Sequence, residues 1–280
     1  MKILSKIFIV FFVFLLFSGV SSAQTPSPIK ILLVPGHDNE VWGAQYGNLK
    51  EAAMTVAVAS RIYDILSKDK RFVVYITRDK NGYTKEFADY FTNHQADVLA
   101  FKEDAKKKTQ QNIATGTFVP KASIVPHNSV TEDIAIRLYG FNKWANDNKM
   151  DAVIHVHFND DGRKNKSKPG PWKGFSVYMP DPQLLNSDKS APLALGIFNA
   201  LKKKYFDAVG IKENGGVIAD QKLIAMGASK TLLPSVRSVL IEYAFIYEKT
   251  MSTYTKRQIA YQNMADITAN AVINYFFPKK

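Results

Sequence analysis

Apolar residues in the first third of the chain follow two alternating patterns. The runs 31–34 and 72–76 are short and continuous, as expected of buried strands. Between them, from Leu49 onward, apolar residues recur on one helical face, at Met54, Val58, Ile62 and Leu66. A strand, a helix and a second strand at this spacing predict a right-handed crossover unit with two parallel strands.

The same patterns return in the second half of the chain. Further strands are predicted at 152–157, 175–179 and 236–241, the last one following Pro234. Helices are predicted where apolar residues share one face, over residues 134–145, 194–205 and 255–276. Strands that alternate with helices predict an α/β fold. We expect a three-layer sandwich with a mainly parallel central sheet and helices on both faces.

Residues 80–127 fit neither pattern well. A charged helix is predicted at 102–111, where Lys106 to Lys108 are expected to form a solvated face. Residues 115–126 contain the glycine and prolines of a loop. Because this long segment lies between two strands of the predicted sheet, we interpret it as an insertion or lid that borders the cleft.

Two stretches match the capping box, in which a glutamate satisfies a backbone N–H at the start of a helix. These are Asn48-x-x-Glu51 and Ser129-x-x-Glu132. For Glu51, capping is therefore an alternative to a functional role.

The N-terminus has the pattern of a secretory signal peptide over residues 1–23. Lys2 and Lys6 precede an apolar core, and small residues lead to Gln24. An uncleaved anchor is the alternative. Residues 24–28 are interpreted as a linker, and residues 29–280 as one catalytic domain. Since no second long apolar run follows, we expect no stable membrane span after cleavage. The protein is expected to be exported, to the periplasm, cell wall or extracellular medium, and to be a monomer.

Composition limits the chemistry further. The chain has no cysteine, so any metal must be bound by histidine, aspartate or glutamate. The formal charge is +12, or +10 without Lys2 and Lys6. A basic protein favours an anionic partner such as a cell-wall polymer or a lipid surface. Nucleic acid is not expected, because the sequence has no motif for binding it.

Polar residues stand at equivalent places after three of the predicted strands. His37, His157 and Glu242 each end an apolar run, and Glu51 begins the helix after the first strand. Sites in parallel sheets form outside the carboxyl ends of the strands, so these residues are expected to converge. Two imidazoles and one carboxylate form the ligand set of a catalytic zinc, and the fourth group, Glu242, is then a candidate general base.

The remaining histidines are less distinctive. His155 and Asn159 share a strand face with His157, so His155 is an alternative ligand or a partner of the ligand. His94 and His127 lie in the irregular segment and are expected to be structural or solvated.

The chain resembles a known family in several short motifs that occur in order. They are Gly36-His37, Gly43-Ala44 and Glu51; Thr77-Arg78-Asp79; residues 154–159; and Pro234 with residues 240–245. These are similar to the motifs of zinc-dependent N-acetylmuramoyl-L-alanine amidases, which cut the amide between the lactyl group of N-acetylmuramic acid and L-alanine in peptidoglycan. Arg137, Asn142 and Ala145-Asn146 are similar to the helix before the third motif.

The resemblance implies a Zn²⁺ hydrolase of cell-wall remodelling or degradation. It implies His37, Glu51 and His157 as zinc ligands and Glu242 as the catalytic carboxylate. Three departures bear on substrate preference. Asp38-Asn39 replaces the usual Gly-Gly, His155-Val156-His157 replaces Ser-Ile-His, and residues 80–127 are longer than usual.

Three rival functions remain open on the sequence. A zinc carboxypeptidase would need a basic residue that clamps a free carboxylate, and the sequence does not place one. A wall-binding protein without catalysis would not need all four site residues. A non-haem iron oxygenase also uses two histidines and a carboxylate, but usually on a β-sandwich.

Overall fold

The computed structural model describes residues 27–122, 130–160, 163–209 and 215–279. The predicted signal peptide, most of the linker, His127 and Ser129 lie outside these residues. Among the described helices, none is both long and apolar enough to cross a membrane.

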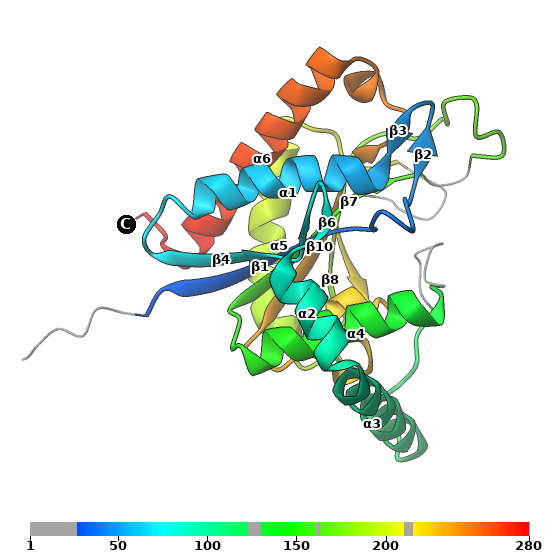
Figure 1. Ribbon diagram of the computed structural model, residues 1–280, viewed down its shortest axis with the longest axis vertical. Coiled ribbons are helices and arrows are strands. Elements are labelled where there is room, and N and C mark those ends of the chain that lie inside the picture. The colour runs from blue at the N-terminus through cyan, green and yellow to red at the C-terminus, as the bar shows by residue number, and fades with distance from the viewer. Residues whose placement is uncertain (1–26, 123–129, 161–162, 210–214, 280) are drawn as a thin grey trace, which may run out of the picture.

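A six-stranded sheet forms the centre of the molecule, in the order β4-β1-β7-β10-β8-β9 (Figure 1). The strands are β1 (Ile29–Pro35), β4 (Phe72–Ile76), β7 (Ala152–Asn159), β8 (Ser176–Pro180), β9 (Val217–Asp220) and β10 (Arg237–Phe245). Strands β4, β1, β7 and β10 are mutually parallel, whereas β8 runs antiparallel to β10. The predicted mainly parallel sheet is confirmed, and β9 is an additional strand that the apolar pattern did not reveal.

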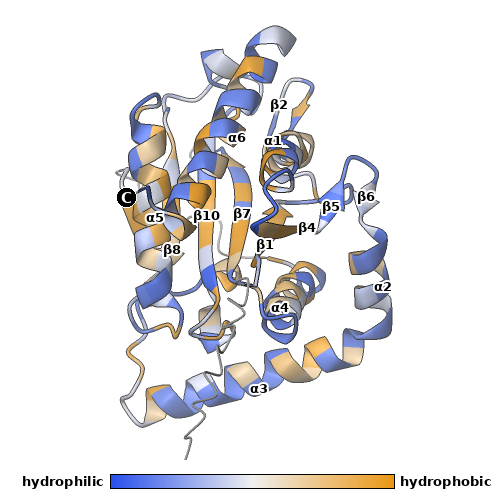
Figure 2. Cartoon of the chain, turned by 90° about the vertical axis from the view of Figure 1, so that its left-hand side faces the viewer, coloured by the Kyte–Doolittle hydropathy of each residue, from blue (hydrophilic) through white to orange (hydrophobic). Residues whose placement is uncertain are grey.

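Helices cover both faces of the sheet, which confirms the three-layer sandwich (Figures 1 and 2). They are α1 (Glu51–Leu66), α2 (Lys85–Asn93), α3 (Gln95–Ala114), α4 (Glu132–Asp147), α5 (Ser187–Lys202) and α6 (Tyr254–Phe276). Helices α1, α5 and α6 pack on one face, and α4 packs on the other with α2 beside it. Short elements complete the fold: β2 (Gln45–Tyr46), β3 (Leu49–Lys50), β5 (Arg78–Asp79), β6 (Gly82–Tyr83), η1 (Ile224–Met226), η2 (Ala228–Lys230) and η3 (Lys249–Met251).

The central strands are apolar throughout because both of their faces are covered. In β1, Ile31 and Leu33 face the α1, α5 and α6 layer, while Leu32 and Val34 face α4. On the α4 side the core is divided into two parts. One lies under α4 and the other under η1, around Leu240.

Both predicted capping boxes are wrong. Helix α1 begins at Glu51, after a β2–β3 hairpin, rather than at Leu49, and its N-cap is Lys50. Helix α4 has Thr131 as its N-cap, and the Glu132 carboxylate contacts Lys102 of α3 instead. At both described N-caps, no side chain accepts a capping hydrogen bond.

The segment 80–127 contains two helices that extend the α4 layer. Phe87 of α2 is buried between Phe141 and Trp144 of α4. Helix α3 packs across α4, and Lys106 to Lys108 are exposed, as predicted for a solvated face. The stretch after α3 is bound to the connection between β8 and α5, because Val119 exchanges hydrogen bonds with the side-chain amide of Gln183.

Candidate metal centre

The first site residue, His37, lies in a tight turn just beyond β1. The backbone N–H of Gly36 donates to the carbonyl of Val156, so the chain is still paired with β7 immediately before the turn. His37 itself has a φ of 62°, in the left-handed region that non-glycine residues rarely adopt. This turn directs the imidazole toward the start of α1.

Glu51 is held in place by hydrogen bonds from two other parts of the chain. Its carboxylate accepts the backbone N–H of Ala44 at 2.8 Å and that of Phe158 at 3.0 Å. The side chain is only 4% exposed. The carboxylate therefore does not cap its own helix but lies between the hairpin and β7.

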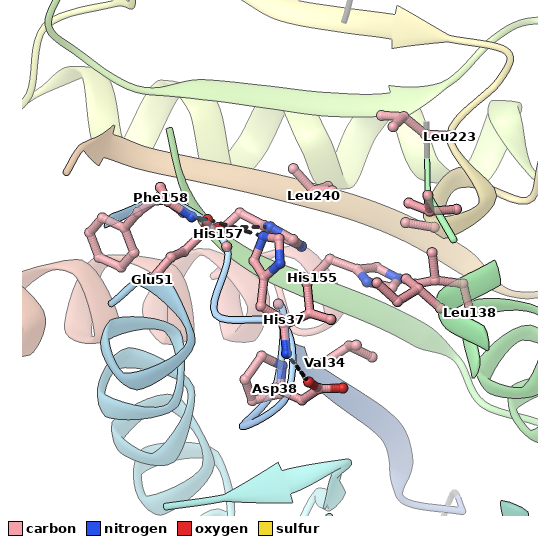
Figure 3. Close-up of a pocket in the computed structure, with 18 of the residues that line it drawn as sticks. Val34, His37, Asp38, Glu51, Leu138, His155, His157, Phe158, Leu223 and Leu240 are labelled. Carbon is pink, nitrogen blue, oxygen red and sulfur yellow. Dashed lines mark hydrogen bonds and ion pairs between the residues drawn. The ribbon is translucent and has the colours of Figure 1, made fainter. Parts of the chain in front are cut away.

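Both predicted histidine ligands meet this carboxylate. His37 Nε2 lies 3.0 Å from Glu51 Oε2, and His157 Nδ1 lies 3.0 Å from Glu51 Oε1 (Figure 3). One ligand atom from each of the three residues lies within 4.8 Å of the others. Ligands at about 2.1 Å from a tetrahedral zinc are roughly 3.4 Å apart, so the three residues fit a metal ion with little movement.

Two glycines make room for this cluster. A Cβ atom at Gly36 would lie 2.2 Å from the His157 ring, and one at Gly43 would lie 2.4 Å from the His37 ring. Gly43 also has a φ of 69°. Glycine is therefore required at both positions, because the backbone passes close to the rings of His37 and His157.

Arg78 is a site residue whose role the sequence did not reveal. Its guanidinium is buried and donates to the carbonyl oxygens of Gly36 at 2.6 Å and Ala52 at 2.8 Å. The hydroxyl of Thr55 also donates to the Gly36 carbonyl. Burial lowers the pKa of Arg78. In the sequence, the sign of this role is an arginine placed just after the apolar run 72–76. In the structure, Arg78 fixes the turn that carries His37.

Asp38 ties the same turn to the α4 layer. Its carboxylate accepts the backbone N–H groups of Glu40 and Val41, at 2.9 and 2.8 Å. It also forms an ion pair with Arg137 of α4 and accepts the hydroxyl of Tyr83. These bonds hold the pKa of Asp38 below its ordinary value, although burial alone would raise it. The departure from the usual Gly-Gly thus produces a braced turn.

The charges in the cluster are strongly coupled. Burial raises the pKa of Glu51, but the two histidines lower it more, so the carboxyl group is ionised. Burial lowers the pKa of His37, but the charge of Glu51 and the hydrogen bond to it raise the pKa by more, so the net shift is upward from the ordinary value. For His157 burial is the larger effect, and its pKa is lowered.

Glu242 lies beside the cluster in the neighbouring strand. The prediction that Glu242 ends its strand is wrong. Strand β10 continues to Phe245, with an irregular register after Glu242. Within the parallel pair, Glu242 is opposite His157. Its side chain is half-buried and lines the same pocket as the three clustered residues.

The structure separates His157 from the other histidines. His155 shares its strand face, but Figure 3 shows the His155 ring on the side of Leu138, away from Glu51. The group of potential ligands found among the described residues contains His157 and not His155. His94 is exposed beside Asp97 and stacks on Tyr90, which confirms the solvated position expected for it.

A pocket of about 780 Å³ opens over the cluster and continues along the sheet. One end contains His37, Glu51, His157 and Glu242. The other end lies between α4 and η1, over His155. Of the described residues in segment 80–127, only Tyr83 lines this pocket.

Comparison with known proteins agrees with this geometry. The sequence profile described as N-acetylmuramoyl-L-alanine amidase matches residues 31–274. Curated protein sequences gave no match.

Solved structures with the same fold include three amidases. N-acetylmuramoyl-L-alanine amidase from Clostridium difficile 630 is 14% identical, with a TM-score of 0.54 over 91% of this chain and 100% of that one. Ami1 from Mycobacterium smegmatis is 15% identical, with a TM-score of 0.55 and coverage of 90% and 99%. AmiC2 of Nostoc punctiforme is 16% identical, with a TM-score of 0.51 and coverage of 89% and 97%.

Proposed function

Because the chain belongs to the N-acetylmuramoyl-L-alanine amidase family, whose members act on peptidoglycan, we propose that His37, Glu51 and His157 bind its catalytic zinc ion and that Glu242 is the general base. The observation that carries this proposal is the convergence of two imidazoles on one buried carboxylate. The family match supports neither the carboxypeptidase nor the oxygenase alternative.

The ligand assignment is supported by how each side chain is held. Glu51 has two backbone donors that orient its carboxylate, and His37 is oriented by a turn that Arg78 and Asp38 brace. Groups that orient ligands in this way strengthen metal binding. When bound, zinc supplies a Lewis acid that polarises the scissile carbonyl and promotes ionisation of water. Three protein ligands leave one coordination position for that chemistry.

The assignment of Glu242 is supported by its place opposite His157. A carboxylate in the neighbouring strand, on the face that lines the pocket, is positioned to take a proton from the attacking water. It then returns this proton to the nitrogen of the departing L-alanine. Because Glu51 already supplies the carboxylate of the ligand set, a second carboxylate ligand would close the open position.

The protein's action on the wall places it outside the cytoplasm. The signal peptide over residues 1–23 and a monomeric state are part of the proposal. We also propose that segment 80–127 limits access to the cleft, through Tyr83 and through its support of α4.

The experiment is the digestion of purified peptidoglycan, followed by labelling of new amino ends. The expected product is a stem peptide with a free N-terminal L-alanine, and a matching muramic acid with a free lactyl carboxylate. Release of a single C-terminal amino acid would instead indicate a carboxypeptidase. Absence of both products, with the wall polymer bound, would indicate a binding protein.

A further inference from the structure

His155 is a buried polar residue for which the catalytic machinery has no use. The residue is 0% exposed, and within the described part of the chain neither ring nitrogen has a hydrogen-bond partner. Burying an unpartnered polar group costs free energy, and such groups in native proteins call for an explanation. The family resemblance does not provide one, since serine is usual at this position.

The ring lies at the floor of the pocket's inner end. In the sheet, His155 is flanked by Val34 of β1 and Leu240 of β10. Leu138 of α4 lies near the ring (Figure 3), and Leu223, next to η1, lines the same pocket. This inner chamber is the gap that divides the core on the α4 face into its two parts.

The walls of the chamber are held at a fixed separation. Asn142 of α4 donates to the carbonyl of Ile224 in η1 at 2.8 Å and to the hydroxyl of Thr231 at 2.9 Å. Because Asn142 is fully buried and makes both bonds, α4 and η1 are joined rather than free to close over His155. The gap is thus a built feature of the fold.

The chemistry of the chamber selects an uncharged ligand. Its walls are mostly apolar. Of the cations that line the pocket, Lys166 and Lys222 are solvent-exposed, and Arg137 is already paired with Asp38 and Glu40. A carboxylate or an ammonium group would lose its hydration there without a buried partner. A neutral imidazole offers one donor and one acceptor. An amide with a small apolar substituent matches this combination.

The distance from the metal centre fits the substrate. His155 and His157 are two residues apart on one strand face, about 7 Å. Two residues of an extended stem peptide span a similar length. The acetamido group of N-acetylmuramic acid is also separated from the scissile amide by only the lactyl link and the ring carbons.

We propose that the chamber over His155 is a specificity subsite that takes an uncharged amide of the substrate, either the acetamido group of the sugar or a carboxamide on the second residue of the stem peptide. This inference rests on the proposed function, because it takes the amide to be cleaved as lying at the His37, Glu51 and His157 cluster.

Three synthetic ligands distinguish the two sources. They are N-acetylmuramoyl-L-alanyl-D-isoglutamine, its analogue with a free amine on the sugar, and its analogue with D-glutamate in place of D-isoglutamine. The enzyme variant is His155→Leu, and the matched control is His94→Leu, which makes the same change on the exposed surface.

The measurement is kcat/KM for each ligand. In His155→Leu, kcat/KM for the parent ligand is expected to fall about tenfold more than for the analogue that lacks the recognised amide, mainly through KM. If the free-amine analogue is the one that shows the smaller fall, the chamber takes the acetamido group. If the D-glutamate analogue shows it, the chamber takes the carboxamide. An equal change for all three ligands overturns the subsite.

Two further measurements keep the test decisive if turnover is lost. Calorimetric titration of the zinc-free protein with the same ligands should show the same tenfold difference in affinity, and equal affinities overturn the proposal. The thermal midpoint of His155→Leu should be no lower than that of wild type, because the change removes two unpartnered polar atoms. A large fall would give His155 a packing role instead.

Failure of the proposed function would look different. Wild-type protein that binds the ligands but hydrolyses none of them contradicts the amidase assignment. The calorimetric comparison then still tests the chamber.

Discussion

Glu242 and His157 stand opposite each other in adjacent parallel strands, β10 and β7. This pairing places a half-buried carboxylate next to a residue of the metal cluster without making it part of the cluster. The two-residue period of the strands puts both side chains on the face that lines the pocket.

Removal of any one clustered residue is expected to abolish metal binding. His37→Ala, Glu51→Ala and His157→Ala should lose stoichiometric zinc, measured by elemental analysis. In wild type, zinc at 100 times its Kd should stabilise the fold by about 2.7 kcal/mol, seen as a rise of several degrees in Tm. The three variants should show no such rise. Retained zinc in His157→Ala, with loss in His155→Ala, would make His155 the ligand.

Glu242→Gln is expected to separate catalysis from metal binding. The amide keeps the shape of the side chain but cannot accept the proton, so activity should fall by about 10²–10⁴. This corresponds to roughly 3–5 kcal/mol of barrier. Zinc content and Tm should stay close to wild type. Near-normal turnover would remove Glu242 from the mechanism, and loss of zinc would make it a ligand.

Gly36→Ala is expected to disrupt the metal centre by steric conflict alone. Its Cβ would lie 2.2 Å from the His157 ring, so the ligand must move. Zinc affinity and activity should both fall by at least tenfold, in line with other changes that misplace a ligand. The control is Gly196→Ala in helix α5, where a Cβ meets open space and should stabilise the protein by about 0.5–1 kcal/mol. Full activity in Gly36→Ala would show that the cluster is looser than this geometry.

Asp38 is expected to act as a positioning residue for His37. Asp38→Gly restores the residue usual in the family but removes the acceptor for two backbone N–H groups and the partner of Arg137. Zinc affinity should weaken about tenfold, as for other groups that support a ligand. Asp38→Asn keeps the acceptor oxygen and should retain most of the affinity. Equal affinity in all three proteins would mean that the turn holds His37 without this brace.

Release of the end of segment 80–127 is expected to relax substrate selection. Gln183→Ala together with Gln221→Ala removes the hydrogen bonds from these two side chains to the backbone of Val119 and Lys121, while leaving the Lys121–Asp181 ion pair in place and Phe87 in the core. Hydrogen exchange in 115–122 should increase, and activity on soluble muropeptides should rise relative to intact wall. Faster exchange with an unchanged substrate profile would show that the segment only packs on the surface.

Acid is expected to weaken the same anchor in wild type. Burial raises the pKa of Asp181, but its bonds with Lys121 and Gln183 lower the pKa by more, so the net shift is downward from the ordinary value. A carboxyl group whose folded pKa is depressed stabilises the fold above its unfolded pKa, and this contribution is lost as the pH falls through the folded pKa. Urea unfolding at several pH values should therefore show a smaller loss of stability below pH 4 in Asp181→Asn than in wild type.

Local patterns in the sequence determined most of the layers and the sheet edge where the site lies. Continuous apolar runs predict strands covered on both faces, and the helix carrying Met54, Val58, Ile62 and Leu66 forms as its period indicates. His37, Glu51, His157 and Glu242 could be assigned to one edge because parallel strands end together. These features depend on residues close together in the chain, so a pattern can carry them.

The tertiary structure decided which atoms meet. The choice between His155 and His157, the use of Glu51 as a shared partner rather than a helix cap, and the buried Arg78 beneath the turn all depend on contacts between distant segments. The left-handed turn at His37 and the gap over His155 likewise arise where separate elements pack against each other. No periodicity within one element encodes such contacts, because they are set by the relative placement of strands, hairpin and helices.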